Sequence, residues 1–269
     1  MFAYVGTRGL TFQTPLTPGR RLPDYELLWD VAFAGGWPAG RVTKAVMRVA
    51  RSDRVGRASK VFALKTLAHA VRHRRPQGDH QVVKSVRALM SLEWIAERYR
   101  PRVVVVWRNP LNMLGTYLDL DWETSGILQQ AVRDRFEGTQ VWPPPAGEET
   151  EKAAWGICAR LAFLLETVGR HPDWRLIRHE SLSADPVPGC RAVLADLEIP
   201  WGAEVEAFLE SSNRPGTRWE TSRVSAEEGT AWKRRLTPDQ VRMGSEVMRR
   251  FAGLPQIGAP FARCLEELV

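Results

Sequence analysis

Arg108 and Thr116 are the two residues whose types and spacing best suit the binding of an anion. Arg108 directly precedes Asn109 and Pro110. A residue before proline is disfavoured in the helical region, whereas proline is tolerated in the first turn, so Asn109 is predicted to cap a helix that begins at Pro110. The free N–H groups and the dipole of a helix N-terminus attract anions. The pattern therefore predicts a phosphate held by the Arg108 guanidinium, with the Thr116 hydroxyl nearby, although it also occurs where the arginine only pairs with a carboxylate.

A predicted strand leads directly into this helix. Residues 103–107, four valines and a tryptophan, have the length and composition of a strand that is buried on both faces of a parallel sheet. The helix after it is expected to run to about Leu120. A second strand is predicted at Trp174–His179 and is followed by Glu180. We expect Glu180 to have a structural role as a hydrogen-bonding residue. The alternative is that it takes part in a proton relay.

A second segment suited to anion binding spans Ser222–Thr237. Its Gly229 permits close approach of the backbone, and Trp232 would anchor the loop by burial. Arg223 and Lys233 supply positive charge. The segment also reads as a plain loop before a helix that Thr237 caps, and both interpretations can hold together.

The other elements follow from apolar periodicity. A short strand is predicted at Gln81–Lys84, and 122–150 is expected to be rich in loops. Helices are predicted at 23–33, 42–49, 59–73, 85–99, 151–170, 188–197 and 237–251. His69 and His73 are one helical turn apart, but no third ligand accompanies them, so we predict no metal site.

Composition narrows the class of protein. The chain has 269 residues, which suffices for one α/β domain over 1–269, and no run approaches 18 apolar residues. We therefore expect no membrane span. Its three cysteines are odd in number and far apart, which argues against a disulfide framework and favours the cytoplasm.

The net charge of +7 is unevenly distributed. Residues 41–108 contain 17 Lys and Arg against four Asp and Glu. Such a block can bind nucleic acid, an anionic surface or a polyanionic small molecule, or it can be a solvated basic face. No nucleic-acid-binding motif is present, so a small anionic ligand is favoured over nucleic acid.

The order of these features resembles the sulfotransferases, especially the bacterial type, that use 3'-phosphoadenosine 5'-phosphosulfate (PAPS). In that family a strand ends in an arginine, a proline follows, and a hydroxyl residue lies eight positions after the arginine. The arginine and the hydroxyl bind the 3'-phosphate. Arg108, Pro110 and Thr116 are similar to these three residues. Glu93–Tyr99 is similar to a family segment that precedes this strand. Val83-Lys84-Ser85 and Gly229–Lys233 resemble two further family segments, with one extra residue in the second.

The resemblance implies an α/β fold with a mostly parallel central sheet flanked by helices, similar to P-loop proteins. It implies transfer of a sulfuryl group from PAPS to a hydroxyl or amine of a small-molecule or carbohydrate acceptor, without a metal. Lys84 would be the catalytic residue near the sulfuryl group. The residues that bind the cofactor, or its product adenosine 3',5'-bisphosphate, would be Arg108, Thr116, Arg223, Gly229, Trp232 and Lys233. The acceptor, the general base and the oligomeric state are not readable from the sequence.

The sequence departs from the family at its N-terminal side. The loop that binds the 5'-phosphosulfate in the family has no counterpart here, and 13–18 resembles a segment that follows that loop. We therefore expect an in-frame loop of this kind in the coding region upstream of Met1. Val86 stands where cytosolic members carry a catalytic histidine. The alternatives are a catalytically impaired sulfotransferase-like protein and, less favoured, a basic nucleic-acid-binding protein.

Overall fold

The computed structural model describes residues 18–19, 21, 26, 29–30, 33, 80, 82–85, 88–120, 130–216, 222–255 and 257–267. The chain divides into two compact units, Met1–Pro101 and Arg102–Val269. A single domain over 1–269 stays a prediction. The helices predicted at 42–49 and 59–73, with His69 and His73, lie outside the described residues. No described helix is both long enough and apolar enough to cross a membrane.

The first unit is built around a small aromatic cluster. Its buried residues are Trp29, Ala88, Trp94 and Ile95. Tyr99 stacks on Phe33 with ring centroids 4.3 Å apart, and its hydroxyl lies 2.6 Å from an Asp30 carboxylate oxygen. The described residues of the predicted 23–33 helix are helical.

The strand predicted at Gln81–Lys84 is wrong: it is absent over its described residues, which are irregular, and Val82 is 74% exposed. The helix predicted at 85–99 is confirmed in part. It ends at Tyr99 as predicted, but it consists of a 3₁₀ turn, η1 (Leu89–Ser91), followed by α4 (Leu92–Tyr99), and the described residues 85 and 88 are not helical. The α-helix begins only after Ser91, whose φ of −126° lies outside the α-helical range. Serine side chains compete for backbone hydrogen bonds, so serine favours helix ends over interiors.

The second unit contains a two-stranded parallel sheet. Strands β1 (Val104–Trp107) and β2 (Arg175–Arg178) pair in the register Val104↔Arg175 to Trp107↔Arg178. Val105 and Trp107 are buried, but Val106 is 50% exposed. Burial of β1 on both faces is therefore not observed, because this small sheet lacks the full covering of a larger parallel sheet.

In the described part of the connection between the strands lie α5 (Pro110–Asp119), α6 (Gln130–Phe136) and α7 (Glu149–Gly169). Seven helices follow β2 in the described part of the chain. They are α8 (His179–Ala184), α9 (Pro186–Asp196), α10 (Ala203–Ser212), α11 (Ser225–Glu228), α12 (Trp232–Arg235), α13 (Pro238–Ala252) and α14 (Gly258–Glu266). The α/β class is thus observed in a coarse form, as a mostly helical chain with a small parallel sheet.

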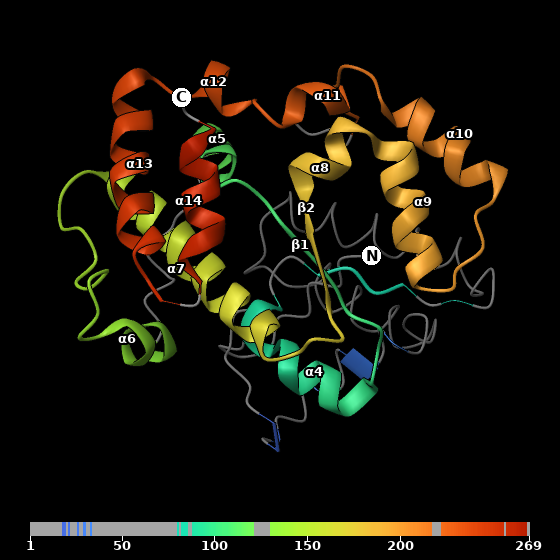
Figure 1. Ribbon diagram of the computed structural model, residues 1–269, viewed down its shortest axis with the longest axis horizontal. Helices are drawn as coiled ribbons and strands as arrows, with labels where there is room; N and C mark the ends of the chain where they lie inside the picture. The colour runs from blue at the N-terminus through green and yellow to red at the C-terminus, as the bar shows by residue number, and fades with distance from the viewer. Residues whose placement is uncertain are drawn as a thin grey trace, which may run out of the picture. The chain divides into compact units, whose positions relative to one another are not determined.

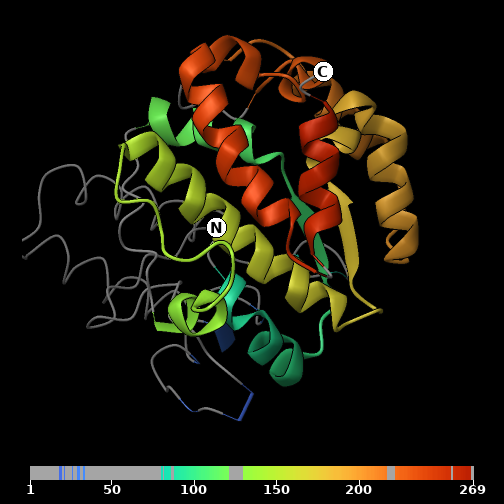
Figure 2. The same ribbon diagram turned by 60° about the vertical axis from the view of Figure 1, so that its left-hand side comes forward.

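The core of the second unit lies among α7, α13 and α14, on one side of the strands, while α8 and α9 lie on the other (Figures 1 and 2). Trp155, Phe136 and Phe251 meet edge to face with ring centroids 5.9 to 6.4 Å apart. Phe251 also contacts Phe261 on α14, at 5.6 Å between centroids. Such aromatic pairs add packing energy beyond their buried area and fix the three helices against each other.

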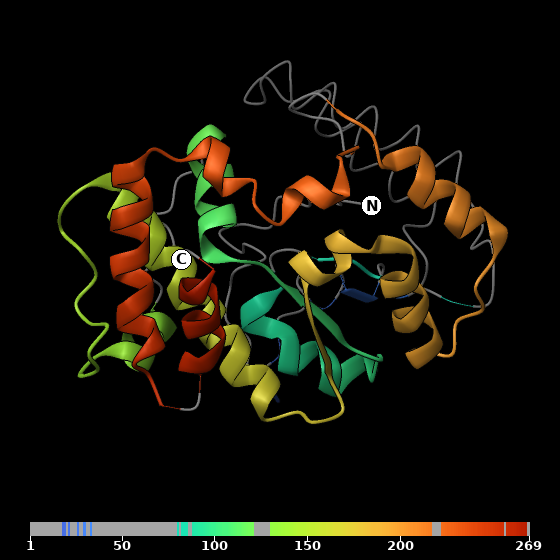
Figure 3. The ribbon, with the colours of Figure 1, turned by 45° about the horizontal axis from the view of Figure 1, so that its top comes forward.

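The carboxyl ends of β1 and β2 lead directly into α5 and α8. Figure 3 shows the α11–α12 segment crossing above these two helices, and α12 contacts α5 while α11 contacts α8. The loop predicted at Ser222–Thr237 therefore contains two short helices. The predicted Thr237 cap is confirmed: its side chain accepts a hydrogen bond from the Gln240 N–H, and Gln240 caps Thr237 in return.

Candidate functional site

Arg108 lies at the junction of β1 and α5, as predicted. Asn109 caps the helix, since its side chain accepts a hydrogen bond from the Leu111 N–H at 2.9 Å, and Pro110 is the first helical residue. The Arg108 side chain is 21% exposed, and its Nη2 donates to Glu228 Oε2 at 2.8 Å. Arg108 Nε is buried and has no hydrogen-bond partner among the described residues. The guanidinium is thus only half satisfied by its carboxylate partner.

Glu180 occupies the N-terminus of α5. Its Oε1 accepts hydrogen bonds from the Asn109 N–H at 2.8 Å and from Asn112 Nδ2 at 3.2 Å, while its Oε2 accepts from Arg178 Nε at 3.2 Å. A carboxylate at this position complements the helix dipole. The prediction that free terminal N–H groups face a ligand is therefore wrong for Asn109 N–H and Leu111 N–H, which protein oxygens satisfy. Glu180 makes the structural hydrogen bonds that we expected.

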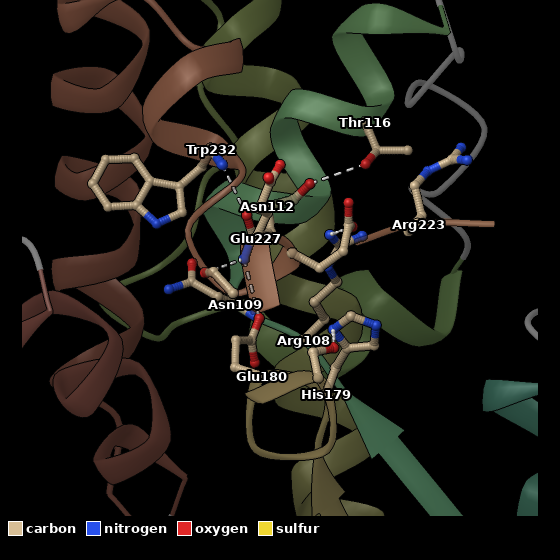
Figure 4. A network of polar contacts seen from close by, with 12 residues as sticks. Arg108, Asn109, Asn112, Thr116, His179, Glu180, Arg223, Glu227 and Trp232 are labelled. Carbon is tan, nitrogen blue, oxygen red and sulfur yellow. Dashed lines mark hydrogen bonds and ion pairs between the residues drawn. The ribbon is translucent and has the colours of Figure 1, made fainter. Parts of the chain in front are cut away.

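Asn112 joins α5 to the start of α12, as Figure 4 shows. Its Nδ2 donates to the Gly229 carbonyl at 2.9 Å, and its Oδ1 accepts from the Trp232 N–H at 2.9 Å. Asn112 and Trp232 are both buried. These hydrogen bonds join two segments that are more than a hundred residues apart in the sequence. Each segment was predicted to bind an anion, and both belong to one cluster.

Thr116 contacts a second arginine that the sequence analysis missed. The Thr116 hydroxyl donates to the Asn112 carbonyl at 3.1 Å and accepts from Arg235 Nη1 at 3.2 Å. Arg235 Nη2 lies 3.9 Å from Glu228 Oε1, and its Nε lies 3.7 Å from Asp119 Oδ2. The basic run after Trp232 was the only sequence signal for Arg235. It could not distinguish Arg235 from Lys233 and Arg234, because all three are consecutive cations.

The remaining predicted residues contribute less to this cluster. Lys233 is exposed, with its Nζ 5.4 Å from the ring centroid of Trp232. Arg223 is partly buried, and its Nη1 donates to the Ser222 carbonyl at 2.6 Å. Lys84 is exposed and belongs to the first unit, so the cluster described here is built without it.

His179 is a further residue that the sequence analysis did not single out. It follows β2 as Arg108 follows β1, and its Nδ1 lies 3.3 Å from Ser183 Oγ. Burial lowers its pKa, and the Arg108 charge lowers it further, while Glu180 and Glu228 oppose the shift. The imidazole is therefore neutral at pH 7. The sequence could have indicated His179 as a site residue through its position directly after a predicted strand, because the carboxyl ends of parallel strands meet at one edge of a sheet.

Burial also lowers the pKa of the Arg108 guanidinium, and the charges of Glu228 and Glu180 counteract this effect. Arginine remains protonated all the same, since its pKa in water is above about 12. The cluster thus presents two guanidiniums, on Arg108 and Arg235, that share the Glu228 carboxylate, and the Thr116 hydroxyl contacts Arg235. Groups of this kind bind a phosphate or sulfate through charged hydrogen bonds.

No family model matches the chain, and neither the curated proteins nor the solved structures contain a match to it.

Proposed function

We propose that the protein binds PAPS and transfers its sulfuryl group to a hydroxyl or amine of a small-molecule or carbohydrate acceptor. The single observation that carries the proposal is the meeting of Arg108 and Thr116 with Gly229 and Trp232 in one cluster. The resemblance to PAPS-dependent sulfotransferases selects these two segments for the same ligand. Nothing in their sequences requires them to touch.

In this proposal the 3'-phosphate lies between the guanidiniums of Arg108 and Arg235. The Thr116 hydroxyl accepts a hydrogen bond from Arg235 Nη1 at 3.2 Å and so positions the second guanidinium. The fold would be the sulfotransferase type, in which ligands lie beyond the carboxyl ends of parallel strands. Arg108 follows β1 at such an end, and this agreement supports the proposal.

Lys84 is proposed to act on the transferring group. The acceptor oxygen or nitrogen forms a bond to sulfur, the bond from sulfur to the bridging oxygen of PAPS breaks, and the electron pair remains on the phosphate oxygen. A lysine ammonium near that oxygen would stabilise the developing charge. The acceptor proton must go to a general base, which the residues do not identify.

A second candidate function is nucleotide binding without sulfuryl transfer. Lys84 favours this second function, because it is exposed in an irregular segment. The proposed transfer needs a strand there to position the lysine ammonium. Nucleic-acid binding, the third alternative, would use the basic residues between 41 and 108. Turnover of labelled PAPS with a panel of alcohols and amines separates the first function from the second.

Binding of adenosine 3',5'-bisphosphate tests the site itself. We expect Arg108→Ala to weaken binding by on the order of 100-fold, because truncation of a buried charged hydrogen-bonding group costs several kcal/mol. Titration calorimetry measures the affinity. Arg242→Ala is the matched control, since Arg242 is an exposed arginine on α13 that pairs, within the described ranges, only with exposed acids of its own helix. Equal affinities for wild type and Arg108→Ala would refute the proposed site, as would a single-stranded oligonucleotide that binds more tightly than the bisphosphate.

A further inference from the structure

Glu228 lies at the centre of the cationic cluster. It is buried, with 11% of its side chain exposed, and is the last residue of α11. One carboxylate oxygen lies 2.8 Å from Arg108 Nη2 and the other lies 3.9 Å from Arg235 Nη2. The carboxylate therefore spans the two guanidiniums that the proposed function assigns to a phosphate.

The carboxylate fits this position incompletely. A guanidinium can present Nε and Nη2 together to two oxygens of one anion. Glu228 uses only the Nη2 of Arg108, and the neighbouring Nε is buried without a partner among the described residues. Its contact with Arg235, at 3.9 Å, is longer than a hydrogen bond. A tetrahedral anion has enough oxygens to satisfy both Arg108 nitrogens and Arg235 at once.

The number of terminal oxygens favours the same exchange for a phosphate monoester dianion. Arg108 and Arg235 carry two positive charges, and Glu228 shares them with Asp119, 3.7 Å from Arg235 Nε, and with Glu180, whose charge also acts on Arg108. A diester monoanion in place of Glu228 would leave this balance unchanged and would offer only two terminal oxygens. A monoester dianion would offer three terminal oxygens and one more negative charge to the same two guanidiniums. A buried charge that loses its partner is costly, so a ligand must compensate both guanidiniums to displace the carboxylate.

We propose that Glu228 occupies the anion position in the free protein and makes the site selective for doubly charged phosphate. Glu228 is thus a specificity-determining residue, and phosphate monoesters displace it where diesters do not. This inference rests on the proposed function for the identity of the natural ligand. The selection itself depends on the guanidiniums of Arg108 and Arg235 and on the carboxylate of Glu228, not on the nucleotide.

The test compares inorganic phosphate, largely a dianion at pH 8, with dimethyl phosphate, a monoanion. Full-length protein carries ¹⁵N-labelled arginine, so that NMR follows the Arg108 Nε–H directly during each titration. Wild type is expected to bind phosphate and to give no response to dimethyl phosphate. Glu228→Gln is expected to bind phosphate about tenfold more tightly and to respond to dimethyl phosphate as well, because the competing charge is gone.

Glu227→Gln is the matched control. Glu227 is on the same short helix, is exposed and pairs with Arg234 at 3.2 Å, so its replacement should leave both titrations unchanged. Glu228→Asp serves if Glu228→Gln does not fold. It keeps the charge but shortens the reach, and should bind phosphate more tightly than wild type by a smaller factor. If both Glu228 variants bind phosphate no more tightly than wild type, Glu228 only positions Arg108 and the inference is overturned.

Adenosine 3',5'-bisphosphate separates this inference from the proposed function. If phosphate responds as expected but the bisphosphate binds no more tightly than phosphate, the nucleotide assignment fails and the role of Glu228 stands. If wild type binds the bisphosphate through Arg108 and Glu228→Gln brings no gain for any anion, the proposed function stands and the role of Glu228 fails.

Discussion

The single side chain of Asn112 connects the segments that form the cluster. Its amide nitrogen donates to the Glu180 carboxylate and to the Gly229 carbonyl, and its oxygen accepts from the Trp232 N–H. All three partners belong to different segments from α5. Because a buried polar group without a partner is costly, these contacts specify one arrangement of the segments around the helix.

Replacement of Asn112 by alanine should lower the free energy of unfolding by about 2–3 kcal/mol, since the buried Trp232 N–H and the partly buried Glu180 and Gly229 each lose a hydrogen bond. Urea denaturation measures this change. Asn213→Ala is the control, because the exposed Asn213 makes one such contact, with the Ser225 N–H. The two variants losing equal stability would contradict the role given to Asn112.

At the residue scale the sequence predicts local features better than partners. The Asn109 cap and the Pro110 start follow from the restrictions that proline imposes on its neighbours, and both are observed. The partner of Arg108 is Glu228, 120 residues away. No local rule selects that carboxylate from the others, so the sequence left open whether Arg108 would pair with an acid.

At the element scale, long amphipathic helices were predicted well. The helices predicted at 151–170 and 237–251 are observed as α7 and α13 with ends within two residues. The short helices α11 and α12 were not predicted, because they have four residues each and a helical periodic pattern needs more than one turn. The helices α10 and α14 were not predicted either.

The turn between α13 and α14 depends on Gly258. A Cβ at this position would lie 2.0 Å from the carbonyl oxygen of Ala252, which is backbone and cannot move aside cheaply. We expect Gly258→Ala to destabilise the protein by about 1–3 kcal/mol through overpacking. Gly169→Ala is the control at the end of α7, where nothing lies within 4 Å, and should be neutral or stabilising by up to about 1 kcal/mol. Thermal unfolding with the same loss for both variants would contradict the close packing.

At the scale of the whole molecule, the site residues Arg108, Thr116, Glu228 and Arg235 all belong to the second compact unit. The predicted catalytic Lys84 belongs to the first. The sequence shows no linker between the units, so composition alone could not divide the chain. Hydrophobic patterning reports which residues are buried, but not which buried residues share a core.

A fragment spanning 102–269 should therefore unfold cooperatively and bind inorganic phosphate with the affinity of the full chain. It should not transfer sulfate, because Lys84 is missing. Circular dichroism during heating and the arginine NMR titration measure the two properties. Loss of phosphate binding by a folded fragment would mean that the first unit contributes to the anion site.

Glu267 sets the shortest length that such a fragment can have. Its carboxylate accepts a hydrogen bond from Asn109 Nδ2 at 3.2 Å and pairs with Arg178, the last residue of β2. A residue just beyond α14 thereby steadies both the cap of α5 and the end of a strand. Trimming the chain at Glu266 would remove both contacts and so disturb the proposed anion site, and a shortened gene should therefore extend past this glutamate.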